Sequence, residues 1–148
     1  MSEPLWTFEH AVECGAPRVF AWEYWTNPAN WDDPPARFEF DGPFATGTRL
    51  TTVLPGQRLQ SVIRKILPGR EALIEMELLR ATVQFLWRFE ELAAERTRIA
   101  QLIRLSGEAG AELIEQAKVL EQSVPLGMTK LALAVRRKWL AEPHRGAN

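Results

Sequence analysis

Residues Glu108–Leu140, EAGAELIEQAKVLEQSVPLGMTKLALAVRRKWL, contain the longest helical pattern in the chain. Apolar or small residues recur in it at steps of three or four, the period of a helix with one buried face. These residues are Leu113, Ala117, Leu120, Val124, Met128, Leu131, Val135 and Trp139. Acidic residues gather in the first half and basic residues in the second, which suits the helix dipole. The segment therefore predicts a long amphipathic helix that covers another apolar surface.

Pro125 interrupts this helical pattern. A proline has no N–H to donate to the carbonyl four residues earlier, and its ring clashes with the preceding turn. Gly127 follows closely and also weakens a helix. We therefore expect either a kink at Pro125 or a new helix that starts with Ser123 as its N-cap.

Before Glu108, apolar and polar residues alternate in most segments, which is the pattern of strands and not of helices. Leu5–Glu13 alternates as a half-buried strand does, and Arg18–Thr26 predicts a short helix with one more turn at Pro28–Trp31. Further strands are predicted around Phe38–Phe40 and at Thr48–Leu54, Arg58–Leu67, Glu71–Leu79, Thr82–Glu90 and Arg96–Leu105. Tight turns between them predict an antiparallel meander, whose apolar face the long helix covers. The fold class is α+β.

Length and composition bound the kind of protein. A chain of 148 residues with 46% hydrophobic content fits a single domain, 1–148, in which 142–148 is expected to be a disordered tail. The net charge of −1 offers no basic field for nucleic acid. The longest apolar run, Leu131–Val135, is too short for stable insertion in a membrane. One cysteine and no signal-peptide pattern lead us to expect a cytoplasmic protein.

Four short motifs carry a family resemblance. They are Ala16-Pro17-Arg18-Val19-Phe20, Asn27-Pro28-Ala29-Asn30-Trp31, Gly47-Thr48 and Trp87-Arg88-Phe89. With these motifs and its order of elements, the chain resembles the helix-grip fold of the START/Bet v 1-like (SRPBCC) superfamily, in particular the polyketide cyclase/dehydrase type. The resemblance implies a curved seven-stranded antiparallel sheet wrapped around a long C-terminal helix, with two short helices after strand 1. It also implies a deep, mostly apolar cavity for lipid-, hormone-, polyketide- or quinone-like molecules, with catalysis in only some members.

Ten residues are expected to line this cavity between sheet and helix. They are His10, Trp31, Phe40, Met76, Phe85, Trp87, Ile99, Gln101, Leu120 and Met128. The aromatic residues either wall a pocket or pack as plain core, because a sequence does not show voids. Gln101 is a polar residue among apolar ones, and its amide must bond to protein, water or ligand. His10 is either an acid–base group in the cavity or a histidine bonded to a neighbouring element or placed at an edge.

Other chemistry has weaker support in the sequence. The candidate nitrogen and sulfur metal ligands are His10, His144 and Cys14, and a zinc site needs three or four that converge. We therefore predict no metal site, no cofactor and no assigned catalytic residue, and we expect Cys14 to be a small, partly buried residue. If strict alternation holds in Arg58–Leu67, Arg64 or Lys65 points inward and favours an acidic ligand. A bulge, or a side chain that reaches back to solvent, would remove this feature.

Three functions remain open at this point. The first is a small-molecule binding protein, entered between the Pro28–Pro35 loop, the strand turns and the Pro125–Gly127 segment. The second is a cyclase, aromatase or dehydratase that uses the same cavity, with His10 as its acid–base group. The third is an interaction module with a filled core and exposed tryptophans that serve a partner; a homodimer is possible. Trp22, Trp25 and Trp31 either shape the cavity entrance or form such a contact. The basic segment Arg136-Arg137-Lys138-Trp139 is either a solvated helix end or a contact to an anionic membrane surface.

Overall fold

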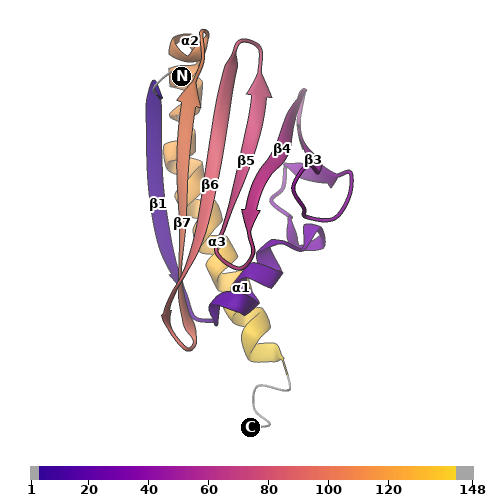
Figure 1. Ribbon diagram of the computed structural model, residues 1–148, viewed down its shortest axis with the longest axis vertical. Helices are drawn as coiled ribbons and strands as arrows, with labels where there is room; N and C mark the ends of the chain where they lie inside the picture. Colours follow the sequence, from indigo (N-terminus) through magenta and orange to yellow (C-terminus); the bar gives the residue numbers. More distant parts are fainter. Residues whose placement is uncertain (1–3, 143–148) are drawn as a thin grey trace.

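In the computed structural model, which describes residues 4–142, a seven-stranded antiparallel sheet curves around one long helix (Figure 1). The elements are β1 (Trp6–Cys14), α1 (Arg18–Trp25), the 3-10 turn η1 (Pro28–Asn30), β2 (Arg37–Phe40), β3 (Arg49–Leu54), β4 (Gln57–Leu67), β5 (Glu71–Leu78), β6 (Ala81–Ala93), β7 (Arg96–Ser106), α2 (Gly110–Ala117) and α3 (Leu120–Ala141). The predicted strands, the helix after the first strand and the α+β class are confirmed.

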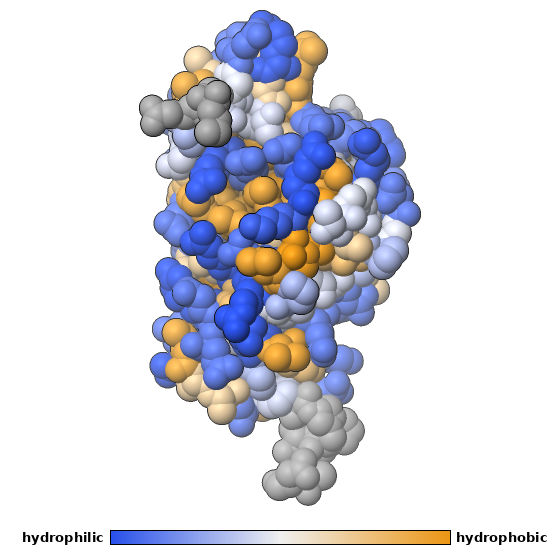
Figure 2. All heavy atoms as spheres, viewed as in Figure 1, coloured by the Kyte–Doolittle hydropathy of each residue, from blue (hydrophilic) through white to orange (hydrophobic). Residues whose placement is uncertain are grey.

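The strand order is β1-β7-β6-β5-β4-β3-β2, with every neighbouring pair antiparallel. Strands β3 to β7 follow one another in sequence through tight turns, a longer connection over residues 41–48 joins β2 to β3, and β1 joins the free edge of β7. Helix α1 and η1 occupy the connection from β1 to β2, so this connection spans from one edge of the sheet to the other. Helix α3 crosses one face of the sheet, and Figure 2 shows hydrophilic residues surrounding a smaller apolar area on the face toward the viewer.

The covered face of the sheet carries two adjacent rows of side chains. The first, the Ile103 row, contains Phe8, Ile103, Phe85, Ile74 and Ile63, each directly opposite the next across a strand pair. The second, the Gln101 row, lies two residues along the strands and contains His10, Gln101, Trp87 and Ala72. Directly opposed residues point to the same face with neighbouring Cβ atoms, so each row is a continuous line of contacts.

The core lies between these rows and the helices. Met128, Ala132 and Val135 of α3 are buried against the sheet; the helical pattern predicts this for Met128 and Val135 but does not include Ala132. Around α1 the core is aromatic: the Trp22 ring lies 5.4 Å from that of Phe89, edge to face. A second group of buried side chains gathers under α2 and the start of α3, around Ile103 and Leu105. No helix within residues 4–142 is long and apolar enough to cross a membrane.

The predicted new helix start at Ser123 is wrong. Helix α2 ends at Ala117 and α3 begins at Leu120, so Pro125 lies inside α3. At the junction the backbone changes to tighter bonds, with the Glu121 N–H donating to the Lys118 carbonyl at 3.0 Å. The helical segment is therefore interrupted between Ala117 and Leu120, and not at Pro125. The predicted tail at 142–148, apart from Glu142, lies outside the described residues.

Strict alternation does not hold in β4, so neither Arg64 nor Lys65 points inward, and the bulge that the sequence left open is present. Strand β4 has a bulge between Ile63 and Lys65, and both basic side chains are exposed. Arg64 instead forms ion pairs with Glu75 at 3.0 Å and Glu77 at 3.1 Å on the outer face of the sheet. One extra residue in a strand cancels the alternation, which is why the pattern pointed one basic residue to the wrong side.

Candidate functional site: a pocket between α3, the loop after α1 and the sheet

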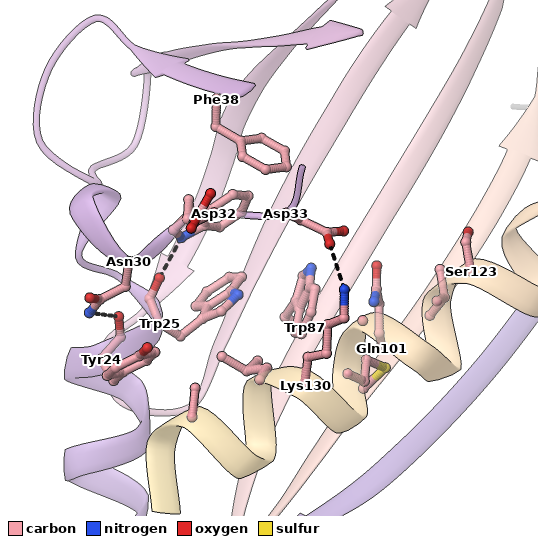
Figure 3. A pocket seen from close by; sticks show the side chains of 16 residues that line it. Tyr24, Trp25, Asn30, Asp32, Asp33, Phe38, Trp87, Gln101, Ser123 and Lys130 are labelled. Carbon is pink, nitrogen blue, oxygen red and sulfur yellow. Dashed lines mark hydrogen bonds and ion pairs between the residues drawn. The ribbon is translucent and has the colours of Figure 1, made fainter. Parts of the chain in front are cut away.

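A pocket of about 480 Å³ opens between α3 and the sheet, at the side where the loop after α1 passes (Figure 3). One wall comes from α1 and the loop: Tyr24, Trp25, Asn30, Trp31, Asp32 and Asp33. The strands add Phe38, Trp87 and Gln101, and α3 adds Ser123, Val124, Gly127, Met128, Lys130, Leu131 and Ala134. The pocket thus has an aromatic wall, a polar point on the sheet and a helical cover.

Small residues on α3 leave the space for this pocket. A Cβ atom built on Gly127 would meet nothing within 4 Å, so the position faces open space. Ala134 lies seven residues further on, about two turns along the same side of the helix, and also lines the pocket. A glycine inside a helix costs about 1 kcal/mol relative to alanine. Its presence here is consistent with a need for room.

The aromatic wall is held by ring contacts and by one short hydrogen bond. The Trp25 ring lies 4.9 Å from that of Trp87 and 5.7 Å from that of Trp31. The indole N–H of Trp31 donates to the Trp25 carbonyl at 2.6 Å, which fixes the loop residue against the end of α1. The Phe38 ring of β2 packs edge to face on Trp31 at 5.4 Å. These contacts make the wall a preformed surface.

The mouth of the pocket carries the charged groups. Lys130 Nζ of α3 lies 3.3 Å from Asp33 Oδ1 of the loop, so an ion pair joins the helix to the loop (Figure 3). Both side chains are exposed, at 71% and 53%, and such pairs contribute roughly 0–1 kcal/mol. The Asn30 amide donates to the Tyr24 carbonyl at 2.9 Å and holds the other side of the loop.

Gln101 is the polar residue inside the pocket. It is only 5% exposed, and its amide bonds to no protein group within residues 4–142. A buried amide without a partner costs about 1–3 kcal/mol. Of the three partners that the sequence left open for Gln101, water and ligand therefore remain.

Four of the ten predicted lining residues meet at this pocket: Trp31, Trp87, Gln101 and Met128. Phe40 lies behind the wall, its ring 5.2 Å from that of Trp31. The others pack in the core or stand at its edge and do not line the pocket: His10, Met76, Phe85, Ile99 and Leu120. Met76, Phe85 and Leu120 pack in the core under α2 and the start of α3, Ile99 packs in the core that includes α1, and His10 is half-buried on the edge strand β1.

Sequence reasoning missed the charged mouth and the small helix residues. Asp32, Asp33 and Lys130 line the pocket from segments that were assigned to entry or to the solvated face. The proline-flanked loop gave a signal, since the expected entry at Pro28–Pro35 and the segment around Pro125 do border the pocket. Gly127 gave another, because a helix interior seldom contains glycine without a reason.

Cys14 takes no part in the pocket. Its thiol is buried, with Sγ 3.6 Å from the Ala132 carbonyl oxygen. Burial raises the pKa of Cys14 to about 11, and the nearby Arg136 guanidinium offsets this only in part. The thiol is therefore protonated at neutral pH and a poor nucleophile. Within the described residues, no group of three or more His, Cys, Asp and Glu side chains is placed to hold a metal ion.

Comparison with known proteins identifies the architecture. No family model matches the sequence, and no curated protein matches it either. Solved structures do match. Norcoclaurine synthase from Thalictrum flavum, in complex with dopamine and hydroxybenzaldehyde, superposes with a TM-score of 0.70 at 15% identity, over 91% of this chain and 86% of that one. The chain has the Bet v 1-like helix-grip fold.

Two further structures with this helix-grip fold cover nearly the whole chain. The Zhui aromatase/cyclase from Streptomyces sp. R1128 has a TM-score of 0.69 at 19% identity, over 90% of this chain and 94% of that one. Ara h 8.0201 has a TM-score of 0.63 at 16% identity, over 93% of this chain and 99% of that one. The predicted helix-grip architecture is therefore confirmed. At such identities the likeness concerns the fold alone.

Proposed function

We propose that the protein binds a small hydrophobic or amphipathic molecule in the pocket between the sheet and α3. The observation that carries the proposal is an aromatic-walled pocket of about 480 Å³ with a buried, unbonded amide, Gln101, on its inner side. Ligand pockets commonly measure about 300–1,000 Å³ and combine apolar walls with a few polar groups. Lipid-, polyketide- and quinone-like molecules all fit this description.

The shape of the wall favours a flat ligand. Trp25, Trp31 and Trp87 present ring surfaces within one cluster, and Phe38 and Tyr24 extend it. Ring faces stack on flat, polarisable molecules and gain about 0.5–1.5 kcal/mol per pair beyond the area buried. An open-chain ligand would gain only the free energy of burying apolar surface area.

A catalytic role as a cyclase, aromatase or dehydratase is the alternative. One protein of the same fold is an aromatase/cyclase, which supports this alternative. It lacks its predicted acid–base group, because His10 does not line the pocket. The carboxylates that do line it, Asp32 and Asp33, are exposed residues at the mouth. Binding therefore needs fewer additional assumptions than catalysis.

A filled interaction module is the third hypothesis, and it has the least support. Trp22 and Trp25 were offered as a partner contact, but they are only 9% and 4% exposed. The open pocket is also the opposite of a filled core. We retain from this hypothesis the prediction of a possible homodimer, and from the composition the predictions of a cytoplasmic protein without a nucleic-acid partner. Size-exclusion chromatography with light scattering tests the first.

Native mass spectrometry on freshly purified protein, beside a denatured control, tests the binding proposal directly. A mass excess that disappears on denaturation is the expected result, and it weighs the ligand. A second experiment titrates the protein with the fluorescent apolar probe 1-anilinonaphthalene-8-sulfonate. Ala134→Phe places a ring in the pocket, whereas Leu133→Phe, its neighbour, places the same ring on an exposed position.

We expect saturable probe binding that Ala134→Phe weakens at least about tenfold and Leu133→Phe leaves unchanged, because only the first variant removes pocket volume. The proposal is wrong if the bare mass is observed and the probe also fails to bind. It is equally wrong if both phenylalanine variants bind the probe as the unaltered protein does.

A further inference from the structure

Three side chains of the pocket carry N–H donors that have no bonding partner within residues 4–142. They are Trp25 and Trp87, each with one indole N–H, and Gln101, with its side-chain amide. Trp25 and Gln101 are deeply buried, with exposures of only 4% and 5%. The indoles of Trp6, Trp31 and Trp139, by contrast, each donate to an oxygen. Unbonded donors are thus concentrated where the pocket lies, with Trp22 the one further unbonded indole in the described part of the chain.

The three groups are neighbours. Trp87 stands directly opposite Gln101 across β6 and β7, which puts their Cβ atoms about 4.5–5.5 Å apart on the covered face. The rings of Trp87 and Trp25 lie 4.9 Å apart. Figure 3 shows all three side chains within the pocket, between the loop and α3, with no dashed line ending on their nitrogen atoms. Trp25, Trp87 and Gln101 therefore form a row of donors, the donor row.

A donor row selects its ligand by chemistry. An indole N–H can only donate, and Gln101 offers two more N–H bonds besides one acceptor. A buried donor without a partner costs free energy, and a hydrocarbon ligand would keep these donors unpaired while excluding water. An oxygen acceptor on the ligand pairs them. The row therefore favours a ligand that carries at least one acceptor oxygen on its inner side.

The charges around the pocket indicate that this oxygen belongs to an uncharged group. The cation that lines the pocket, Lys130, is at the mouth, 71% exposed and paired with Asp33. A carboxylate at the donor row would be buried without a counter-ion, which is costly. An ammonium group would also be buried without a counter-ion, and it would meet several N–H donors and a single acceptor, the Gln101 amide oxygen. A carbonyl has neither difficulty.

We infer that the donor row binds the carbonyl oxygen of a flat, uncharged aromatic ketone, quinone or ester, an inference that rests on the binding function proposed above. The carbonyl points to Trp25, Trp87 and Gln101, and the ring system stacks along the tryptophan wall. The ion pair of Asp33 and Lys130 then lies over the outer end of the ligand.

Four naphthalenes of similar size test this inference. They are 2-acetylnaphthalene, with a carbonyl; 2-isopropenylnaphthalene, with a methylene group in place of the oxygen; 2-naphthoate, an anion; and 1-(2-naphthyl)ethylamine, a cation at neutral pH. Dissociation constants come from quenching of tryptophan fluorescence and from calorimetry. We expect the ketone to bind about tenfold or more tightly than its isopropenyl counterpart, the effect of one or more hydrogen bonds to buried donors. The ketone should also bind more tightly than either ion.

Substitutions test whether the donor row causes the preference for the ketone over the isopropenyl compound. Gln101→Leu and Trp87→Phe each remove donors, and the affinity ratio of ketone to isopropenyl compound should fall toward one. Trp22→Phe is the matched control, because its indole is also unbonded within residues 4–142 but does not line the pocket, and the ratio should persist. The carbonyl stretching frequency of the bound ketone gives an independent readout. It should lie below its value in hexane and rise in Gln101→Leu.

The outcomes separate this inference from the proposed function. If none of the four compounds binds although the protein binds 1-anilinonaphthalene-8-sulfonate, the inference fails and the proposed function stands; if the native mass is bare and this probe also fails to bind, both fail. If ketone and isopropenyl compound bind equally, the pocket binds apolar molecules but the donor row does not select a carbonyl. Tighter binding of the anion or the cation likewise overturns the inference, as does a ratio that Gln101→Leu and Trp87→Phe leave unchanged.

Discussion

The Ile103 row and the Gln101 row are neighbours on one sheet, yet only the second borders a pocket. In the Ile103 row, Ile103, Ile74 and Ile63 are at most 4% exposed and pack without space. In the Gln101 row, the same strands carry a polar amide and the small Ala72 beside Trp87. The hydrogen bonds of the sheet are the same in both rows. The two rows therefore differ in the size and polarity of their side chains, and not in the pairing of their strands.

The helix repeats this difference along its length. Met128, Ala132 and Val135 of α3 are buried against the sheet, whereas Gly127 and Ala134 line the pocket with little or no side chain. The space between the sheet and α3 is thus filled or left open by side chains of both elements. Substitutions in the packed region and in the pocket can therefore test this difference.

The largest expected effect is in the packed row. Ile103→Ala should lower the free energy of unfolding by about 2–5 kcal/mol, because it leaves a cavity where the side chain is fully buried. Denaturation in guanidinium chloride measures it. Leu133→Ala, at a position 58% exposed, is the control and should change stability by less than about 0.5 kcal/mol. A loss below about 1 kcal/mol in Ile103→Ala would mean that this row is not tightly packed.

The reactivity of thiols compares the packed core around Cys14 with the pocket at Ala134. With its pKa raised from 9.0 to about 11, the Cys14 thiol at pH 8 holds about 100-fold less thiolate than an ordinary thiol. Alkylation by iodoacetamide, followed by mass spectrometry, should be slower by at least this factor. Ala134→Cys places a second thiol in the pocket, and this one should react rapidly. Equal rates at both positions would contradict the contrast.

The same shift makes a prediction for stability against pH. The pKa of Cys14 is higher in the folded than in the unfolded protein, so ionisation favours unfolding. The contribution of the buried thiol is complete below pH 9 and is lost as the pH rises from 9 to about 11. Cys14→Ala should remove this part of the pH dependence.

A smaller and opposite effect is expected in the Gln101 row. Gln101→Leu should raise the free energy of unfolding of the empty protein by about 1–2 kcal/mol, because it replaces an unbonded buried amide with an apolar side chain of similar shape. Thermal and chemical denaturation check the sign. A destabilised variant would show that Gln101 has a partner that contributes to folding, such as an ordered water.

The smallest effect concerns Gly127. Gly127→Ala should raise the free energy of unfolding by about 0.5–1 kcal/mol, since alanine is the better helix former and its methyl group meets nothing within 4 Å. Thr129→Ala, on the exposed side of α3, gains helix propensity without reaching the pocket and is the control. If Gly127→Ala destabilises the protein, the space beside the helix is not open.

The sequence predicts the fold well because alternation and helical period act over many residues. Thr82–Glu90, for example, alternates Val83, Phe85, Trp87 and Phe89 with polar partners, so a single misplaced residue does not change the assignment. The same logic fails at the bulge after Ile63, where one extra residue reverses the side to which Lys65 points. Local insertions in a strand leave no periodic signal.

The pocket is less predictable because it depends on residues outside the periodic elements. Trp31, Asp32 and Asp33 reach it from a loop, whose course the sequence does not specify. His10 and Trp87 occupy the same row and looked equally suited to a cavity, yet only Trp87 borders the space. Which part of a row stays open depends on where α3 lies, and helix placement is a result of packing over the whole sheet.

The width of the sheet has a consequence of its own. Seven strands at about 4.8 Å spacing span about 29 Å between the outermost axes, while a helix with its side chains is about 10 Å thick. Helix α3 lies chiefly against β1, at one edge. A single cylinder laid along one side of a trough about three times its width leaves a strip uncovered, and α1, η1 and the loop roof only part of that strip. The volume of the pocket is therefore what the helices and the loop leave uncovered. A few side-chain exchanges can enlarge or remove this volume without changing the hydrogen bonds of the sheet.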